Sequence, residues 1–104
     1  MKQQEPWMII WSQIGGFRSM TMIGAYDYLS DGPNALIFKF KASRKFNFCR
    51  IEYLPDPDLY KMILAKYNWS KLDFRPIKQE IFNEVYADQL QDIFSDKTGL
   101  CLSL

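Results

Sequence analysis

The sequence contains no histidine, and this absence excludes several kinds of site. Without imidazole there is no Ser-His-Asp or Cys-His catalytic arrangement, no histidine metal ligand and no histidine general base near neutral pH. Only two cysteines are present, Cys49 and Cys101, and their spacing matches no zinc-binding motif. We therefore expect no catalytic residue, no metal site and no cofactor, and predict that the protein is not an enzyme.

The sequence also lacks a long apolar run. The stretch "MKQQEPWMIIWSQIGG" has an apolar cluster too short to span a bilayer, without the small-residue cleavage site of a signal peptide. We therefore expect a cytoplasmic protein that does not associate with membranes. Both cysteines are expected to be free thiols, and Cys49, which lies in an apolar strand-like run, is predicted to be in the core.

Aromatic side chains are abundant. The 104 residues fit one domain with a modest core, and 16% of them are Phe, Tyr or Trp. Such rings fill small cores and also supply binding surfaces, so their number alone does not choose between these uses.

Charge is distributed unevenly along the chain. The net charge is only +1, but residues 79–104 carry five acids and one lysine, which gives −4. Residues 1–78 carry the other 12 basic and 7 acidic side chains, which gives +5. The chain therefore has a basic body and an acidic end, so its charge is strongly asymmetric although its net charge is small.

The N-terminal part predicts a short helix. Pro6 suits a first helical position, Gly15-Gly16 suits a helix end, and apolar residues recur at helical spacing through residues 5–14. Residues 16–29 are ambiguous, although alternation favours a strand and Gly24 suggests a bulge. A turn follows at "SDGPN", residues 30–34.

Alternating residues predict an antiparallel hairpin from 35–42 and 46–54. Residues 58–67 fit a helix and a strand equally well by their own pattern, because both spacings are present. Residues 71–79 alternate and predict another strand, with Pro76 at its edge or end.

The C-terminal segment, "QEIFNEVYADQLQDIFSDKTGL" at residues 79–100, predicts a helix that ends at Gly99. Its apolar residues cover one broad face at 100° per residue. Acids recur every fourth residue on the other face, and like charges at this spacing repel each other. This acidic ladder consists of Glu80, Glu84, Asp88, Asp92 and Asp96. It is either a solvated helix face or a docking surface for a basic partner.

The predicted hairpin carries the opposite charge. Its basic residues are interleaved with phenylalanines, and sheets that bind single strands combine rings for bases with cations for phosphates. In "IFKFK", however, rings and lysines point to opposite faces, so Phe38 and Phe40 are expected to enter the core. The candidate nucleic-acid-binding residues are Lys39, Lys41, Arg44, Lys45 and Arg50.

Three stretches resemble a family of small proteins from phages and mobile elements. They are "IGGFRSMTMIGAYDYLSDGPNALIFKFKA", the "DLY" at residues 58–60, and "VYADQLQDIFSDKTGLCLSL". The chain departs from the family pattern around Gly24, where it reads "MTMIGA". The resemblance weakly favours a strand over residues 58–67. It implies a viral or mobile-element setting, with the host cytoplasm as the location, and implies no activity.

Together these patterns predict one small α+β domain over residues 1–104. A mainly antiparallel sheet of about four strands packs against a C-terminal helix, with a short N-terminal helix beside it. The first functional hypothesis is non-catalytic docking on a host or defence-system protein through the acidic ladder. Host takeover and anti-defence proteins, including inhibitors of CRISPR effectors, act in this way. The alternative hypothesis is nucleic-acid binding through the basic hairpin.

Overall fold

The computed structural model describes residues 5–16, 18, 21, 23–41, 43–69 and 75–100. It has the expected α+β architecture, and the described residues form five strands where about four were predicted. In chain order the elements are α1 (Pro6–Gln13), β1 (Tyr26–Ser30), β2 (Ala35–Lys39), β3 (Phe48–Leu54), β4 (Leu59–Lys66), β5 (Lys78–Val85), the short 3₁₀ turn η1 (Ala87–Gln89) and α3 (Leu90–Thr98).

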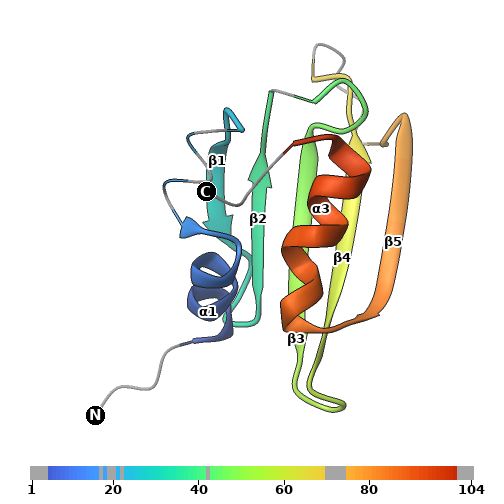
Figure 1. The fold of residues 1–104 in the computed structure, drawn as a ribbon. Helices are drawn as coiled ribbons and strands as arrows, with labels where there is room; N and C mark the ends of the chain where they lie inside the picture. Colours follow the sequence, from blue (N-terminus) through green and yellow to red (C-terminus); the bar gives the residue numbers. More distant parts are fainter. Residues whose placement is uncertain are drawn as a thin grey trace.

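The five strands form one antiparallel sheet in the order of the chain (Figure 1). Each strand pairs with the next one, so the sheet is a simple meander. One row of paired residues crosses all five strands: Leu29 pairs with Ile37, Ile37 with Arg50, Arg50 with Ile63, and Ile63 with Ile81.

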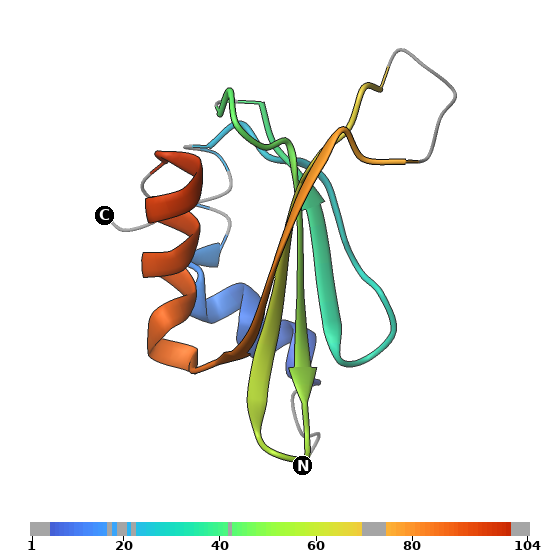
Figure 2. The same ribbon diagram turned by 90° about the vertical axis from the view of Figure 1, so that its right-hand side faces the viewer.

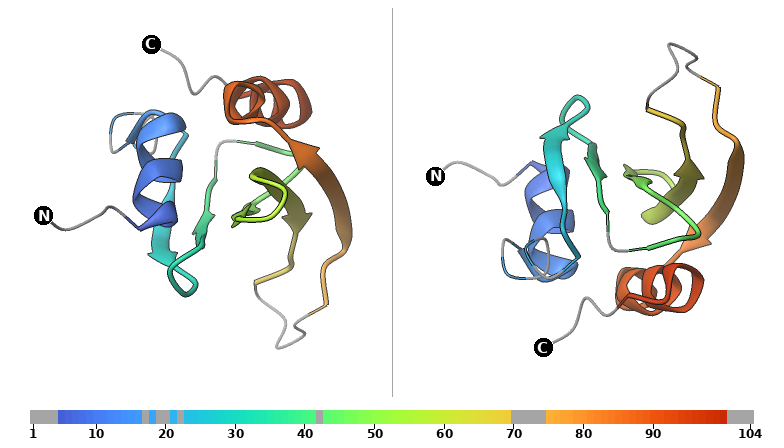
Figure 3. Two further views of the ribbon diagram at one scale, coloured as in Figure 1. Left: turned by 90° about the horizontal axis from the view of Figure 1, so that it is seen from below. Right: turned by 90° about the horizontal axis from the view of Figure 1, so that it is seen from above.

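Both labelled helices lie on the same side of the sheet (Figures 2 and 3). Within the described residues no element covers the other side, which we call the open face. Antiparallel sheets commonly have one packed and one solvated face. In the described part of the chain, no helix has the length and apolar character needed to cross a membrane.

The core lies between the sheet and the two helices. Alternate residues of each strand point to the helix side, and these are the buried ones, such as Phe38, Ile51 and Met62. Phe94 of α3 packs on β2 and the loop after it, with its ring centroid 5.9 Å from Phe38 and 5.2 Å from Phe40. The aromatic contact anchors α3 to the sheet.

The predicted C-terminal helix is wrong in its first half. Residues 78–85 form β5, and α3 begins only at Leu90. Ile81 faces Ile63, and Phe82 faces Met62, so the two residues project to opposite faces of the sheet, as in a strand. An irregularity with Glu84 at φ 57° then returns Val85 to the core. Pairing with β4 therefore outweighs local helical spacing.

Other expectations stand. α1, the hairpin of β2 and β3, and the left-handed Gly99 at the end of α3 are confirmed. The ambiguous residues 58–67 contain strand β4. Among the described residues of 16–29, strand β1 begins at Tyr26, and the irregularity of its pairing lies between Tyr26 and Leu29, where Asp27 has a positive φ, and not at Gly24. Of the strand predicted over residues 71–79, residues 71–74 lie outside the described part.

Candidate functional site

The open face is lined by cross-strand rows of side chains. One row contains Tyr26, Lys39, Phe48, Ala65 and Gln79. The next row contains Leu29, Ile37, Arg50, Ile63 and Ile81. Because the residues between them in sequence point to the helix side, both rows point away from the helices.

Rings and lysines gather at one end of this face. We call this set the aromatic–lysine cluster: Tyr26, Lys39, Lys41, Phe48, Tyr67 and Trp69. Its members come from β1, β2, β3 and the chain just after β2 and β4. Figure 2 shows the chain after β4 leading to the side away from α3. Four segments that are distant in sequence thus meet on one surface.

Three of the rings contact one another in a row, with Tyr67 between Phe48 and Trp69. The Phe48 and Tyr67 rings meet edge to face with centroids 5.4 Å apart, and Tyr67 stacks on Trp69 with centroids 4.8 Å apart and planes 17° apart. Trp69 remains 44% exposed, so this aromatic surface is open to solvent. Offset or edge-to-face ring pairs of this kind are favourable arrangements.

The lysines lie over the rings. Lys39 Nζ lies 4.4 Å from the Trp69 ring centroid and 6.0 Å from that of Tyr26, while Lys41 Nζ lies 4.9 Å from Tyr26. Lys39 also approaches Asp27, with 3.4 Å between Nζ and Oδ2. Rings and cations therefore share one face, unlike the separation expected from β2 alone.

Hydrogen bonds from the β2–β3 connection hold the cluster in place. The Asn47 side chain donates to the Tyr67 carbonyl and accepts from the Tyr67 N–H, each at 2.8 Å. Ser43 Oγ donates to the Thr98 carbonyl at 2.9 Å and accepts from Lys45 N at 3.1 Å. The connection is thus tied both to the chain after β4 and to the end of α3.

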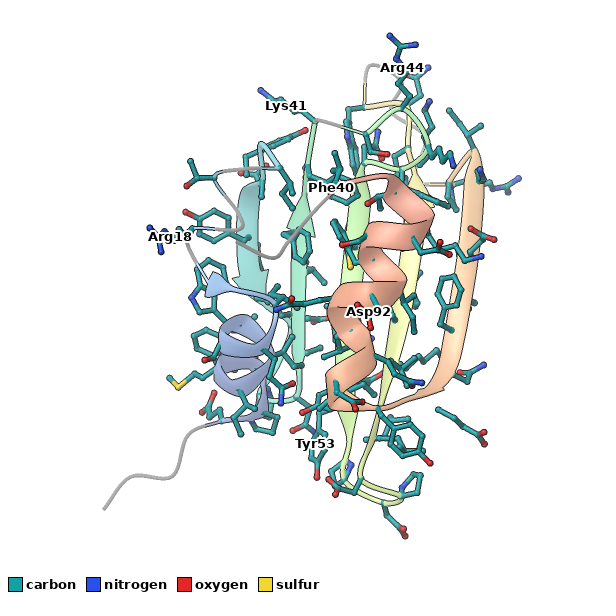
Figure 4. All side chains as sticks on the ribbon, in the orientation of Figure 1. Arg18, Phe40, Lys41, Arg44, Tyr53 and Asp92 are labelled. Atoms are coloured by element: carbon teal, nitrogen blue, oxygen red, sulfur yellow. The ribbon has the colours of Figure 1, made fainter. Side chains whose placement is uncertain are left out.

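The same end of the molecule carries further positive charge. Lys41, Arg44 and Lys45 are exposed, and Figure 4 shows Lys41 and Arg44 at one end of the sheet. Lys66 Nζ donates to the Arg44 carbonyl at 2.7 Å, and Lys78 Nζ lies 4.7 Å from the Phe46 ring centroid. Lys66 and Lys78 pair with each other one residue along from the open-face pair Ala65 and Gln79, so they add positive charge to this end of the molecule on the helix side and not on the open face.

Arg50 is the exception among the predicted basic residues. Its guanidinium pairs with Asp31 at 3.2 Å and with Glu52 at 3.1 Å. Partial burial alone lowers the pKa of Arg50, but the hydrogen bonds to Glu52 and Asp31 outweigh burial and raise that pKa above its ordinary value. Because its guanidinium already binds two carboxylates, Arg50 links neighbouring parts of the sheet, and it is not a candidate phosphate contact.

Burial of the hairpin phenylalanines agrees with the sequence in part. Phe38 and Phe40 are buried as predicted, and Phe46 is buried as well. Phe48 is half-buried and shares the open face with Lys39. The two-residue spacing of Phe48 from Arg50 could have predicted that both point to the same face. No local pattern linked Tyr26, Tyr67 or Trp69 to the hairpin.

The acidic ladder is not one helix face. Glu80 and Glu84 lie on β5, Asp88 lies in η1, and Asp92 and Asp96 lie on α3. Glu80 is half-buried opposite Leu64, whereas the other four are exposed. The idea of a continuous acidic stripe is therefore wrong, because a strand and a turn interrupt the four-residue spacing.

The last three acids remain as a smaller acidic patch, which we define as Asp88, Asp92 and Asp96. None of the three pairs with a cation among the described residues. Figure 4 shows Asp92 on the side of α3 that faces away from the sheet. Asp88 and Asp92 also border a cavity of about 370 Å³ that is lined in addition by Gln13, Ala87 and Gln91.

The described residues give no support for a reactive cysteine or for a metal site. Cys49 is buried, as predicted, and burial raises the pKa of its thiol far above the ordinary range, so it is not a reactive nucleophile. Cys101 lies outside the described residues. Across the described ranges, no group of three or more acidic or cysteine side chains is placed to hold a metal ion.

Comparisons with protein-family models, with curated proteins and with solved structures gave no match.

Proposed function

We propose that this protein binds single-stranded nucleic acid on the open face of its sheet, at the aromatic–lysine cluster. The observation that carries the proposal is the position of Tyr26, Phe48, Tyr67 and Trp69 on the same uncovered face as Lys39 and Lys41. Proteins that bind single strands combine stacking rings with a positively charged track in this way.

The two kinds of side chain have different tasks. A base that stacks on an aromatic side chain contributes about 1–3 kcal/mol, largely independent of its identity. Lys41 lies over the Tyr26 ring, and the exposed Arg44 and Lys45 follow it in the chain, so these cations can neutralise phosphates and release counterions. Stacking requires an exposed base face, so the cluster favours single strands over duplexes.

Electrostatics supports one orientation of binding. The acidic patch on η1 and α3 lies on the helix side of the sheet, and the aromatic–lysine cluster lies on the open face. A polyanion is repelled by the first and attracted by the second, so it meets the molecule with the open face toward it.

Fluorescence anisotropy with labelled oligonucleotides tests this function. We expect short single strands of DNA or RNA to bind, a duplex of equal length to bind more weakly, and Trp69→Leu to reduce single-strand affinity at least fivefold, as loss of one stacked base implies. Lys61→Ala is the matched control, because Lys61 lies on the open face but outside the cluster. Absence of binding to every oligonucleotide would refute the function.

The acidic patch supports a second candidate, docking on a basic host or defence-system protein. Its three carboxylates are exposed and have no cation partner among the described residues. In this proposal the protein acts in the host cytoplasm, in host takeover or anti-defence, without catalysis. Asp88→Lys, Asp92→Lys and Asp96→Lys together should abolish capture of a host partner, and equal capture by this variant would exclude the patch.

A further inference from the structure

We propose that Lys39 closes the stacking position on Trp69 in the free protein and moves from the indole to a phosphate when a base binds. This inference rests on the proposed function, which it extends by assigning one residue two successive partners. It makes Lys39 a residue that couples base stacking to phosphate binding.

The position of the ammonium group is the first observation. Lys39 Nζ lies 4.4 Å from the Trp69 ring centroid, while Tyr67 stacks on the same indole at 4.8 Å. A ring has two faces for stacking, and Tyr67 covers one of them. In this proposal the ammonium group lies over the other face, which is the one that a base would have to use to stack on Trp69.

The second observation is that Lys39 is weakly held. Its Nζ–Oδ2 distance to Asp27 is 3.4 Å, and the Asp27 side chain is 59% exposed, so solvent and salt weaken this pair. The Lys39 side chain itself is 33% exposed. A cation–π contact at an exposed ring contributes less than a stacked base does. The exchange of ammonium for base is therefore favourable.

The third observation is that the displaced lysine has a suitable destination. Lys39 ends β2, and Lys41, Arg44 and Lys45 follow it in the chain; Figure 4 shows Lys41 and Arg44 at this end of the sheet. A flexible four-carbon side chain can turn its ammonium group from the indole toward a phosphate that these residues attract. The base and the phosphate of one nucleotide then contact Trp69 and Lys39 together.

A double-mutant cycle on oligonucleotide affinity distinguishes this exchange from a simple phosphate contact. Lys39→Ala removes a phosphate contact but also opens the Trp69 face, so its two effects partly cancel. In the Trp69→Leu background there is no face to open, and we expect Lys39→Ala to reduce affinity at least threefold more than it does in the wild-type background. Lys41→Ala is the matched control, and its effect should be equal in both backgrounds.

The ¹⁹F spectrum of protein labelled with 5-fluorotryptophan gives a second readout. The Trp69 resonance, assigned through Trp69→Leu, should shift in free Lys39→Ala and free Lys39→Gln, but not in free Lys41→Ala. If the wild type binds oligonucleotides but the cycle is additive and the resonance does not shift, the exchange is wrong and the proposed function survives. If the wild type binds no oligonucleotide, both are wrong.

Discussion

The Asn47 side chain takes the place of a strand neighbour for Tyr67. Its amide donates to the Tyr67 carbonyl and accepts from the Tyr67 N–H, both at 2.8 Å, just beyond the last residue of β4. A side chain thereby extends the ladder by one residue. This is what places the Tyr67 ring between Phe48 and Trp69.

Replacement of Asn47 should therefore affect both stability and binding. Asn47→Ala leaves two partly buried backbone groups without partners, and we expect a loss of about 1–3 kcal/mol in the free energy of unfolding. Urea denaturation measures this loss. Asn83→Ala, at an exposed position on β5, is the control and should change stability by less than about 0.5 kcal/mol. Equal stability of both variants would contradict the role of Asn47.

Phe94 should be the main anchor of α3. Phe94→Ala removes the ring that contacts Phe38 and Phe40, and we expect it to lower the free energy of unfolding by about 3–5 kcal/mol. Asp92→Ala, on the exposed side of the same helix, should have little effect. A small effect of Phe94→Ala in thermal or urea unfolding would mean that α3 contributes little to the core.

The salt dependence of oligonucleotide binding should count the phosphate contacts. Each lysine that contacts a phosphate of a single strand contributes about 0.7 to the slope of log affinity against log salt concentration. We expect Lys41→Ala and Lys45→Ala each to reduce the slope by about this amount. Arg50→Gln should leave the slope unchanged, because Arg50 is paired with Asp31 and Glu52. A reduced slope for Arg50→Gln would restore Arg50 to the site.

Buried Cys49 should make stability fall at alkaline pH. Burial raises the pKa of the folded thiol, whereas the unfolded thiol titrates near about pH 8.5. Above that pH the unfolded chain has lost a proton that the folded chain keeps, so the free energy of unfolding falls by up to about 1.4 kcal/mol per pH unit. The stabilising contribution is fully present below about pH 8.5.

Denaturation of the wild type and of Cys49→Ala between pH 7 and pH 10 measures this effect. The variant is expected to be less stable at pH 7 because of the lost packing, and the difference between the two proteins should narrow as the pH rises. A constant difference across this range would show that Cys49 does not titrate on unfolding.

The sequence was most informative where a local pattern has one solution. Alternation in β2 and β3 predicts their pairing, and it separates buried Phe38 from exposed Lys41. Pro6 and Gly99 mark helix ends correctly. Between Ile81 and Phe94 the apolar residues fit a long helix, and only pairing with β4 and the positive φ of Glu84 show why a strand forms first.

The candidate site was less predictable because it is assembled from distant segments. The alternation in β2 assigns Lys39 to the solvent-exposed face. Its neighbours Tyr26 and Trp69, however, lie 13 positions before it and 30 positions after it in the sequence. Likewise, the loss of Arg50 from the site depends on Asp31, which lies in the connection between β1 and β2, 19 positions earlier in the chain. Contacts of this kind follow from register and not from local spacing.

The order of elements has a consequence for synthesis. Every strand pairs with the one before it in the chain, so the strands can pair one after another as the chain leaves the ribosome. The apolar side chains of Phe38 and Phe40 remain exposed to solvent until α3 is synthesised and Phe94 packs on them. A chain truncated before Leu90 would therefore contain all five strands but expose this apolar surface, and it would be prone to aggregation or chaperone binding.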